Sequence, residues 1–205
     1  MRRAEFPLRP SCPIPMSALG TPHSELPVPT PHSPDFCYNF SLMSLYSIGH
    51  SNVEIDGFLG LLLRHSIDTL VDTRSQPFSR YSPQFNQGAL RKSLAGAGIA
   101  YEYMGRELGG RPQASEFYYG EGKVDYDRLA GAPFYLSAIE RLIELGAACR
   151  VAFMCSEADY HNCHRYNLIT RTLVRRQIPV EHIMHSGDVV ASCAEEFEPD
   201  QRSLF

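Results

Sequence analysis

The sequence predicts an α/β fold: a three-layer sandwich around a mainly parallel sheet of about five strands. Short apolar runs typical of buried strands alternate with segments that have the 3.6-residue spacing of amphipathic helices. This alternation repeats four times along the chain. Strands that are separated by helices pair in parallel, because each helical crossover returns the chain to the same edge of the sheet. The 205 residues are enough for one such domain with tails.

The elements are expected in a regular order. The first strand, Leu45–Ile48, is followed by a helix that begins near Val53 with Ser51 or Asn52 as its cap. Residues 104–131 lack clear periodicity, as a lid or binding loop often does. The other strands are expected at Thr69–Asp72, Ile99–Tyr103, Val151–Cys155 and Val180–Met184. The other helices are expected at Gln87–Ala97, Pro133–Leu145 and Tyr166–Gln177, with Gly98 and Gly146 as the stops of the first two.

The two ends of the chain differ in composition from the middle. Nine of the fifteen prolines lie between Pro7 and Pro34, which predicts a flexible, polyproline-like tail over residues 1–42. Residues 43–193 are expected to form the single α/β domain, and residues 194–205 an acidic tail. Folded-type sequence begins at Met43, so that a start of the protein at this methionine is an alternative.

Composition limits the classes of partner. The formal net charge of −4 argues against a large nucleic-acid-coating surface, although a local basic patch stays open. Apolar runs are too short for a membrane span, so no membrane partner is expected. The chain has six cysteines, but it can build its own core and lacks an apolar signal at its N-terminus, which favours reduced thiols and a cytoplasmic location. Oligomeric state and cofactors are not indicated.

Polar residues follow the expected strands at the points where they end. Because ligands of open parallel sheets bind outside the carboxyl ends of the strands, these side chains are expected to share one edge. The residues are His50 after the first strand, Asp72 and Arg74 after the second, Glu102 and Tyr103 in the third, Cys155 and Glu157 after the fourth, and His185 after the fifth.

The densest set of reactive side chains begins at the end of the fourth strand. Cys155, Glu157, His161, Cys163, His164 and Arg165 occur within eleven residues, just before a helix pattern. A strand, a polar loop and a helix start bring free backbone N–H groups together, which suits a binding site.

Several motifs resemble those of the domain-of-unknown-function family 488. They are Ser47-Ile-Gly-His-Ser51, Leu70-Val-Asp-Thr-Arg74 with Pro77-x-Ser79-Arg80, Gly98-Ile-x-Tyr101, Leu108-Gly-Gly110, Met154-Cys155-x-Glu157 and Cys163-His164-Arg165. The likeness covers about residues 43–185 in the same order. It implies an α/β domain and brings no established reaction. His161 lies outside the matched motifs.

Four roles for this stretch remain open. Arg74, Arg80 and Arg165 could surround a phosphate or carboxylate, or could pair with Asp72, Glu102 and Glu157 in a buried ion network. Cys155 or Cys163 could be a nucleophile, or both could be packed thiols.

The third role is a metal site, and the fourth is contact with nucleic acid. Donors are plentiful, but there are no paired Cys-x-x-Cys hooks, so a structural zinc is not expected and no metal ligand is assigned. A catalytic metal held by N, O and S donors stays open. The fourth role would use arginines on the last helix together with stacking aromatics. These side chains are Arg165, Arg171, Arg175, Arg176, Tyr101, Tyr103, Phe117, Tyr118 and Tyr119.

The function expected from the sequence is an enzyme-like cleft for an anionic small molecule, such as a nucleotide or modified base. The alternative is a non-catalytic nucleic-acid or protein-interaction module. His50 is the first candidate for acid–base work, because histidine titrates near neutral pH. The candidate catalytic residues are His50, Asp72, Cys155, Glu157 and Cys163, and the candidate anion-binding residues are Ser51, Arg74, Arg80, Tyr101, His164 and Arg165.

Overall fold

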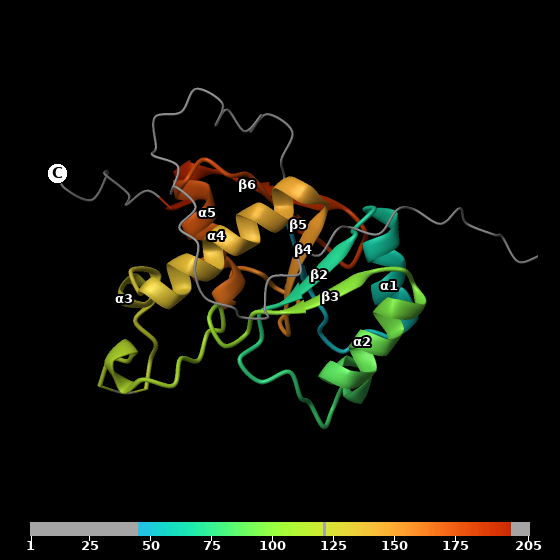
Figure 1. Cartoon of the computed structure of the whole chain (residues 1–205), viewed down its shortest axis with the longest axis horizontal. Coiled ribbons are helices and arrows are strands. Elements are labelled where there is room, and N and C mark those ends of the chain that lie inside the picture. Colours follow the sequence, from blue (N-terminus) through green and yellow to red (C-terminus); the bar gives the residue numbers. More distant parts are fainter. Residues whose placement is uncertain (1–44, 121, 198–205) are drawn as a thin grey trace, which may run out of the picture.

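The structure, a computed structural model, describes residues 45–120 and 122–197 and has one six-stranded sheet at its centre (Figure 1). The strand order is β3-β2-β4-β1-β5-β6. The first five strands are parallel, and β6 is antiparallel to β5. The strands are β1 (Leu45–Gly49), β2 (Thr69–Asp72), β3 (Ala100–Tyr103), β4 (Val151–Cys155), β5 (Val180–Ile183) and β6 (Val189–Ser192).

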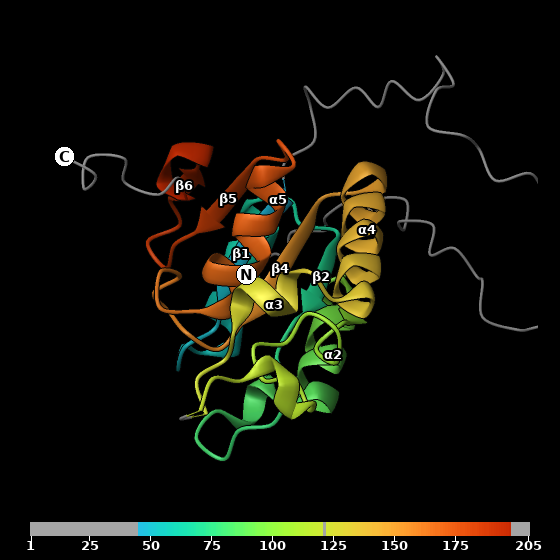
Figure 2. The same cartoon turned by 90° about the vertical axis from the view of Figure 1, so that its left-hand side faces the viewer.

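Helices cover both faces of the sheet and make the outer layers of the sandwich (Figures 1 and 2). One face packs against α1 and α2, and the other against α3, α4, α5 and the π-helix that precedes α5. The helices are α1 (Ile55–Arg64), α2 (Gln87–Gly96), α3 (Tyr126–Ala130), α4 (Pro133–Ala148), the π-helix Arg165–Thr170 and α5 (Arg171–Arg175). Short 3₁₀ turns lie at Pro83–Phe85, Ser115–Phe117 and Ala194–Phe197.

The two cores follow from the alternation of side chains along the central strands. In β4, Val151 and Phe153 pack beneath α4 and α5, whereas Ala152 and Met154 pack against α1 and α2. Successive side chains of a strand point to opposite faces, so a strand covered on both sides is apolar throughout. All five residues of β4 are buried, which places the polar residues of this region beyond its carboxyl end.

The predicted α/β class is confirmed, with differences at the ends of elements. The sheet has six strands rather than about five, because the turn at Gly187 (φ +86°) returns the chain to pair β6 with β5. The first helix begins at Ile55 after Glu54, without a side-chain cap from Ser51 or Asn52. Helix α4 continues past Gly146 to Ala148. These differences depend on local hydrogen bonds, which the periodicity of the apolar residues does not reveal.

The last predicted helix has an unexpected beginning. Its first turns, Arg165–Thr170, are a π-helix, and the Thr170 hydroxyl donates to the Arg165 carbonyl oxygen (2.8 Å). Such turns contain an extra residue and are frequent at functional sites. The expected tail over residues 1–42 lies outside the described residues. No helix within residues 45–120 and 122–197 has the length and apolar character needed to cross a bilayer.

Candidate functional site

Three adjacent strands bring the predicted polar residues to one edge of the sheet. Strands β2, β4 and β1 are neighbours, and their carboxyl ends lead into Asp72–Arg74, Cys155–Glu157 and His50. Backbone hydrogen bonds extend the pairing beyond the strands: His50 N–H donates to the Cys155 carbonyl (3.1 Å) and Thr73 N–H to that of Met154 (3.0 Å). The segments that hold the candidate residues are therefore fixed to the sheet by backbone contacts.

A polar cavity of about 370 Å³ opens beside these segments. Its walls come from the loop after β2, the segment between β3 and α4, and the loop after β4. The ionisable side chains that line it are Arg74, Arg111, Tyr126, Glu157, Cys163 and His164. Such a volume is within the range of small-molecule sites.

Arg74 is held rigidly at the floor of this cavity. Its Nε and Nη2 donate to the two carboxylate oxygens of Asp72 (2.9 and 2.7 Å), and Nη2 also donates to the Phe85 carbonyl (2.8 Å). The Tyr101 hydroxyl donates to the same carboxylate (2.9 Å). Asp72 and Arg74 are both buried, and removing their charges from water costs free energy. The hydrogen bonds that nearly all of their polar atoms make offset this cost. The buried ion network considered above thus exists for Asp72 and Arg74.

His50 completes this network as a neutral ring. Its Nδ1 faces the Ser51 carbonyl (2.6 Å), which can only accept, and its Nε2 faces Nη1 of Arg74 (3.2 Å), which can only donate. The hydrogen must therefore be on Nδ1. Burial, reinforced by the charge of Arg74, lowers the pKa of His50 to about 4. Both nitrogens are thus occupied, and His50 supports Arg74 rather than the cavity.

His164 has the opposite tautomer and faces a thiol. Its Nε2 lies 3.1 Å from the Thr73 carbonyl and 3.2 Å from the Thr73 hydroxyl oxygen, whose own hydrogen goes to the Met154 carbonyl (2.8 Å). Both oxygens therefore accept, and Nε2 must carry the hydrogen. The lone pair of Nδ1 is left toward Sγ of Cys163, at 3.6 Å.

Cys163 is the more acidic of two neighbouring thiols. A hydrogen bond from Cys155, joined by contacts with His164 and the Arg165 backbone N–H (3.4 Å), lowers the pKa of Cys163 to about 6 against the effect of burial. Burial raises the pKa of Cys155 well above its ordinary value. At neutral pH the pair therefore has its negative charge on Cys163, the member that lines the cavity.

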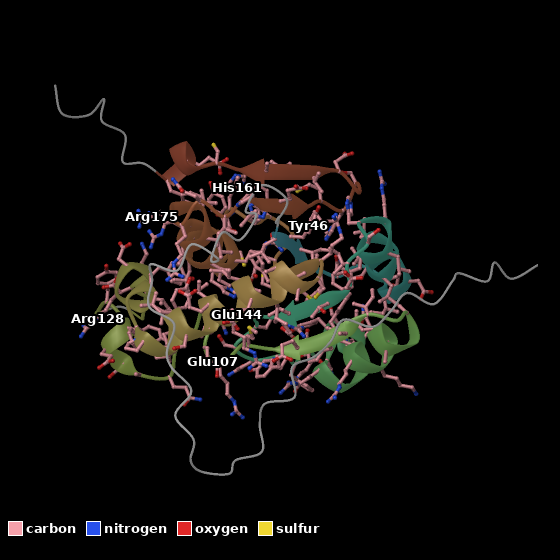
Figure 3. All side chains as sticks on the ribbon, turned by 45° about the horizontal axis from the view of Figure 1, so that its top comes forward. Tyr46, Glu107, Arg128, Glu144, His161 and Arg175 are labelled. Atoms are coloured by element: carbon pink, nitrogen blue, oxygen red, sulfur yellow. The ribbon has the colours of Figure 1, made fainter. Side chains whose placement is uncertain are left out.

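Glu157 lies next to both thiols. Its Oε2 is 3.3 Å from Sγ of Cys163. Burial acts to raise the pKa of Glu157, but its hydrogen bonds outweigh this effect and lower that pKa. The donor atoms of Cys155, Glu157 and Cys163 all lie within 4.8 Å of one another, a spacing that a metal ion could bridge. His161 does not join them: it is 57% exposed and contacts Asp159 (Figure 3).

Arg165 lies beneath the loop instead of in the cavity. It is 1% exposed, and its Nη2 donates to the Ala158 carbonyl (3.0 Å). Its Nε and Nη1 find no partner among the residues that the structure describes. The predicted anion-binding role would require this guanidinium to reach the cavity, whose lining does not include it.

Two glycines make the close packing of the site possible. A β-carbon at Gly110 would lie 2.7 Å from Cβ of His164, and one at Gly49 would lie 1.8 Å from the Glu157 carbonyl oxygen. These distances are below van der Waals contact. Larger residues would therefore displace the His164 ring or the loop after β4.

Comparison with known protein families matches residues 54–172 to the "Domain of unknown function DUF488". The chain belongs to the DUF488 family. The match contains all the motifs given above except Ser47–Ser51, which lies upstream of it. No curated protein and no solved structure matches this DUF488 chain.

Other predicted residues of the DUF488 domain lie away from the cavity. Arg80 is exposed, and the Ser51 hydroxyl contacts Asn52. Nε2 of His185 donates to the Gly49 carbonyl oxygen (2.8 Å), which can only accept. Glu102 pairs with Arg141 on the surface.

Sequence reasoning missed two ionisable residues that line the cavity, Arg111 and Tyr126. Both lie in or next to the aperiodic segment between β3 and α4. Burial, with the charges of Cys163 and Glu157, raises the pKa of Tyr126, which keeps its phenol protonated. The length of the aperiodic segment was the only signal for them.

Proposed function

We propose that this DUF488 domain is a thiol-dependent enzyme, a hydrolase or transferase that acts on a small anionic molecule. The observation that supports this most directly is the contact between Cys163 and His164 at the wall of a polar cavity. A nucleophile, a base within reach and a third group that orients the base are the parts that covalent catalysis requires. Here the third group is the Thr73 carbonyl.

The proposed reaction has two steps. In the first, the Cys163 thiolate, whose proton has passed to Nδ1 of His164, bonds to the electrophilic carbon or phosphorus of an ester group in the substrate. The bond to the leaving group breaks, and the imidazolium returns the proton to that group. In the second, His164 takes a proton from water or another acceptor molecule, whose oxygen attacks the same atom and releases the Cys163 thiolate. The Arg165 backbone N–H, which contacts Cys163, stabilises the thiolate between turnovers.

The charge of the substrate is inferred from the two arginines of the cavity. Arg74 is neutralised by Asp72, whereas none of the ion pairs among the described residues involves Arg111. Arg111 is exposed at the cavity wall and is thus available to an anionic group. Tyr126, as a protonated phenol, can donate a hydrogen bond to the substrate.

The nucleic-acid alternative has less support. Of the arginines predicted to form a basic helix face, Arg165 is buried, Arg171 pairs with Asp127 (2.7 Å) and Arg176 pairs with Glu140 (2.5 Å). Paired arginines are poor contacts for phosphates, because the carboxylate must first be displaced.

Alkylation by iodoacetamide tests the thiol, with the modified cysteine identified by mass spectrometry between pH 4.5 and 9. We expect Cys163 to react first, with a midpoint near pH 6, because the thiolate is the reactive form. His164→Asn should move the midpoint upward. Turnover in a screen of small anionic esters should vanish in Cys163→Ala and persist in Cys155→Ala.

The proposal fails if Cys163 reacts no faster than an ordinary thiol of pKa about 8.5, or if turnover survives in Cys163→Ala. Protein purified without chelators should also be analysed for metals. A stoichiometric ion that is lost in Cys155→Ala and in Cys163→Ala would assign the cluster to metal binding instead.

A further inference from the structure

A second hollow adjoins the cavity and shares one wall with it. It has a volume of about 630 Å³ and lies between the loop after β2 and the first turn of α2. Ser75, Gln76 and Phe78 line both hollows. A ligand that occupies the cavity can therefore extend over this loop into the second hollow without crossing another element.

Phe78 is the aromatic side chain at the border. It is 69% exposed, and no ring contact involves it among the described aromatic pairs. Single exposed hydrophobic residues are normal on protein surfaces, so exposure alone indicates nothing. Tyr81 in the same loop is 97% exposed and lines neither hollow. What distinguishes Phe78 is its place between two hollows, with its ring open to a partner.

The two hollows differ in charge. Together, the cavity (the first hollow) and the second hollow form one groove. Its charged side chains, Arg74, Arg111 and Glu157, all line the first hollow, together with Cys163. The second is lined by no charged residue; it has Phe78, Pro77 and the amides of Gln76, Asn86 and Gln87. Amides offer both hydrogen-bond donors and acceptors, which suits the edge of a nitrogen heterocycle. The groove is thus divided into a charged half and a neutral half with an aromatic surface.

We propose that the groove binds a nucleotide, with its anionic end beside Arg111 and its base stacked on Phe78. A nucleotide has the same division into a charged phosphate and a neutral planar ring. Stacking on an aromatic side chain suits any base, because every base has a π-face. The inference rests on the proposed function, since the reactive part of the ligand would lie near Cys163, and it names the substrate class.

Titration calorimetry on the full chain tests this, with Cys163→Ala as the background so that no ligand is consumed. The probes are the four common nucleoside 5′-monophosphates, ribose 5-phosphate and inorganic phosphate. At least one nucleotide should bind about tenfold or more tightly than ribose 5-phosphate, because stacking adds to the contact of the anion.

Three surface substitutions separate the two halves of the groove. Phe78→Ala should weaken nucleotide binding roughly tenfold and leave ribose 5-phosphate unchanged. Tyr81→Ala, the matched control, should change neither. Arg111→Gln should weaken both ligands.

The outcomes distinguish failure of this inference from failure of the proposed function. Equal affinity for nucleotides and ribose 5-phosphate, or equal effects of Phe78→Ala and Tyr81→Ala, would overturn the base site and leave the anion site intact. A single-stranded oligonucleotide that binds much more tightly than every mononucleotide would also overturn it, in favour of a polymer. If no anion binds and Arg111→Gln has no effect, both proposals lose their basis.

Discussion

Arg165 has an unusual environment for a buried arginine. A buried guanidinium normally pairs with a carboxylate, because an uncompensated charge away from water is costly. Here Nε and Nη1 find no hydrogen-bond partner in the described part of the chain. The charge of Arg165 lowers the pKa of Cys155, although burial keeps that pKa raised overall. The thiol pair, through Cys155, is thus a nearby group whose negative charge can compensate Arg165.

This assignment predicts different effects on reactivity and on stability. Arg165→Met removes the charge but retains an apolar side chain of similar length. The alkylation midpoint of Cys163 should rise by roughly one pH unit, as expected when a nearby opposite charge is lost. The free energy of unfolding in urea should change by no more than about 1 kcal/mol, because the lost bond to Ala158 is offset by relief of the buried charge.

Arg165→Lys is the control for charge. It should keep the midpoint near that of the wild type. If Arg165→Met lowers stability by several kcal/mol with an unchanged midpoint, Arg165 has a structural role and the thiols do not depend on it.

At the level of elements, the segment between β3 and α4 matters because it brings Arg111 to the cavity and Gly110 against His164. The Arg111 backbone N–H donates to the hydroxyl of Ser75 (3.0 Å), which joins the segment to the loop after β2. The orientation of His164 is therefore set from two sides, by the Thr73 carbonyl and by the absence of a side chain at residue 110.

Gly110→Ala tests this packing. The added methyl group would lie 2.7 Å from Cβ of His164, so the His164 side chain must shift, which disturbs its contact with Cys163. We expect alkylation of Cys163 at pH 6.5 to slow several-fold, since a displaced His164 stabilises the thiolate less. Gly120→Ala is the matched control in the same segment, because a β-carbon there meets nothing within 4 Å. Equal rates in the two variants would show that Gly110 does not position His164.

The elements that the sequence predicts well are those whose faces are buried. Strand β4 is apolar throughout because both of its faces are covered, and α2 ends where Gly98 has a positive φ of +74°. Strand β6 is different: Val189 and Val190 remain about 40% exposed, and a four-residue strand with little burial has no clear period. The formation of this edge strand depends on its hairpin pairing with β5, which composition does not reveal.

The candidate site was predictable in its sequence-local part and in the convergence of the strand ends at one edge of the sheet. Cys163 and His164 are adjacent in the chain, and the motif around them suffices to single them out. Arg80 shares a loop with Arg74 but is exposed, because loop geometry rather than sequence distance decides which arginine turns inward. Tyr126 contributes from a distant helix, and only tertiary packing brings it to the cavity.

For the molecule as a whole, two buried histidines make folding depend on pH. His182 lies between the hydroxyls of Ser47 (2.5 Å) and Ser192 (2.8 Å) and joins β1, β5 and β6 through side chains. Burial, with the charge of Arg165, lowers the pKa of His182 to about 3, as burial lowers that of His50 to about 4. The two rings lie at different places on one sheet. Protonation of either ring would destabilise the folded state.

The sign of the dependence follows from proton binding. In the unfolded chain both histidines titrate near their ordinary pKa of about 6.5, whereas in the folded protein they stay neutral down to about pH 4. Between these values the unfolded state binds more protons, so the contribution of the two histidines to stability is fully present above pH 6.5 and is lost as the pH falls. Each histidine contributes a slope of about 1.4 kcal/mol per pH unit well inside this window.

Urea unfolding at intervals between pH 7.5 and 4.5 should therefore show a steep loss of stability below pH 6. His182→Gln should reduce the slope by about half, whatever its effect on stability at pH 7.5, because only one titrating ring remains. A slope that is the same in the variant, or a stability that is flat from pH 7.5 to 5, would mean that the buried rings do not govern the acid sensitivity of this fold.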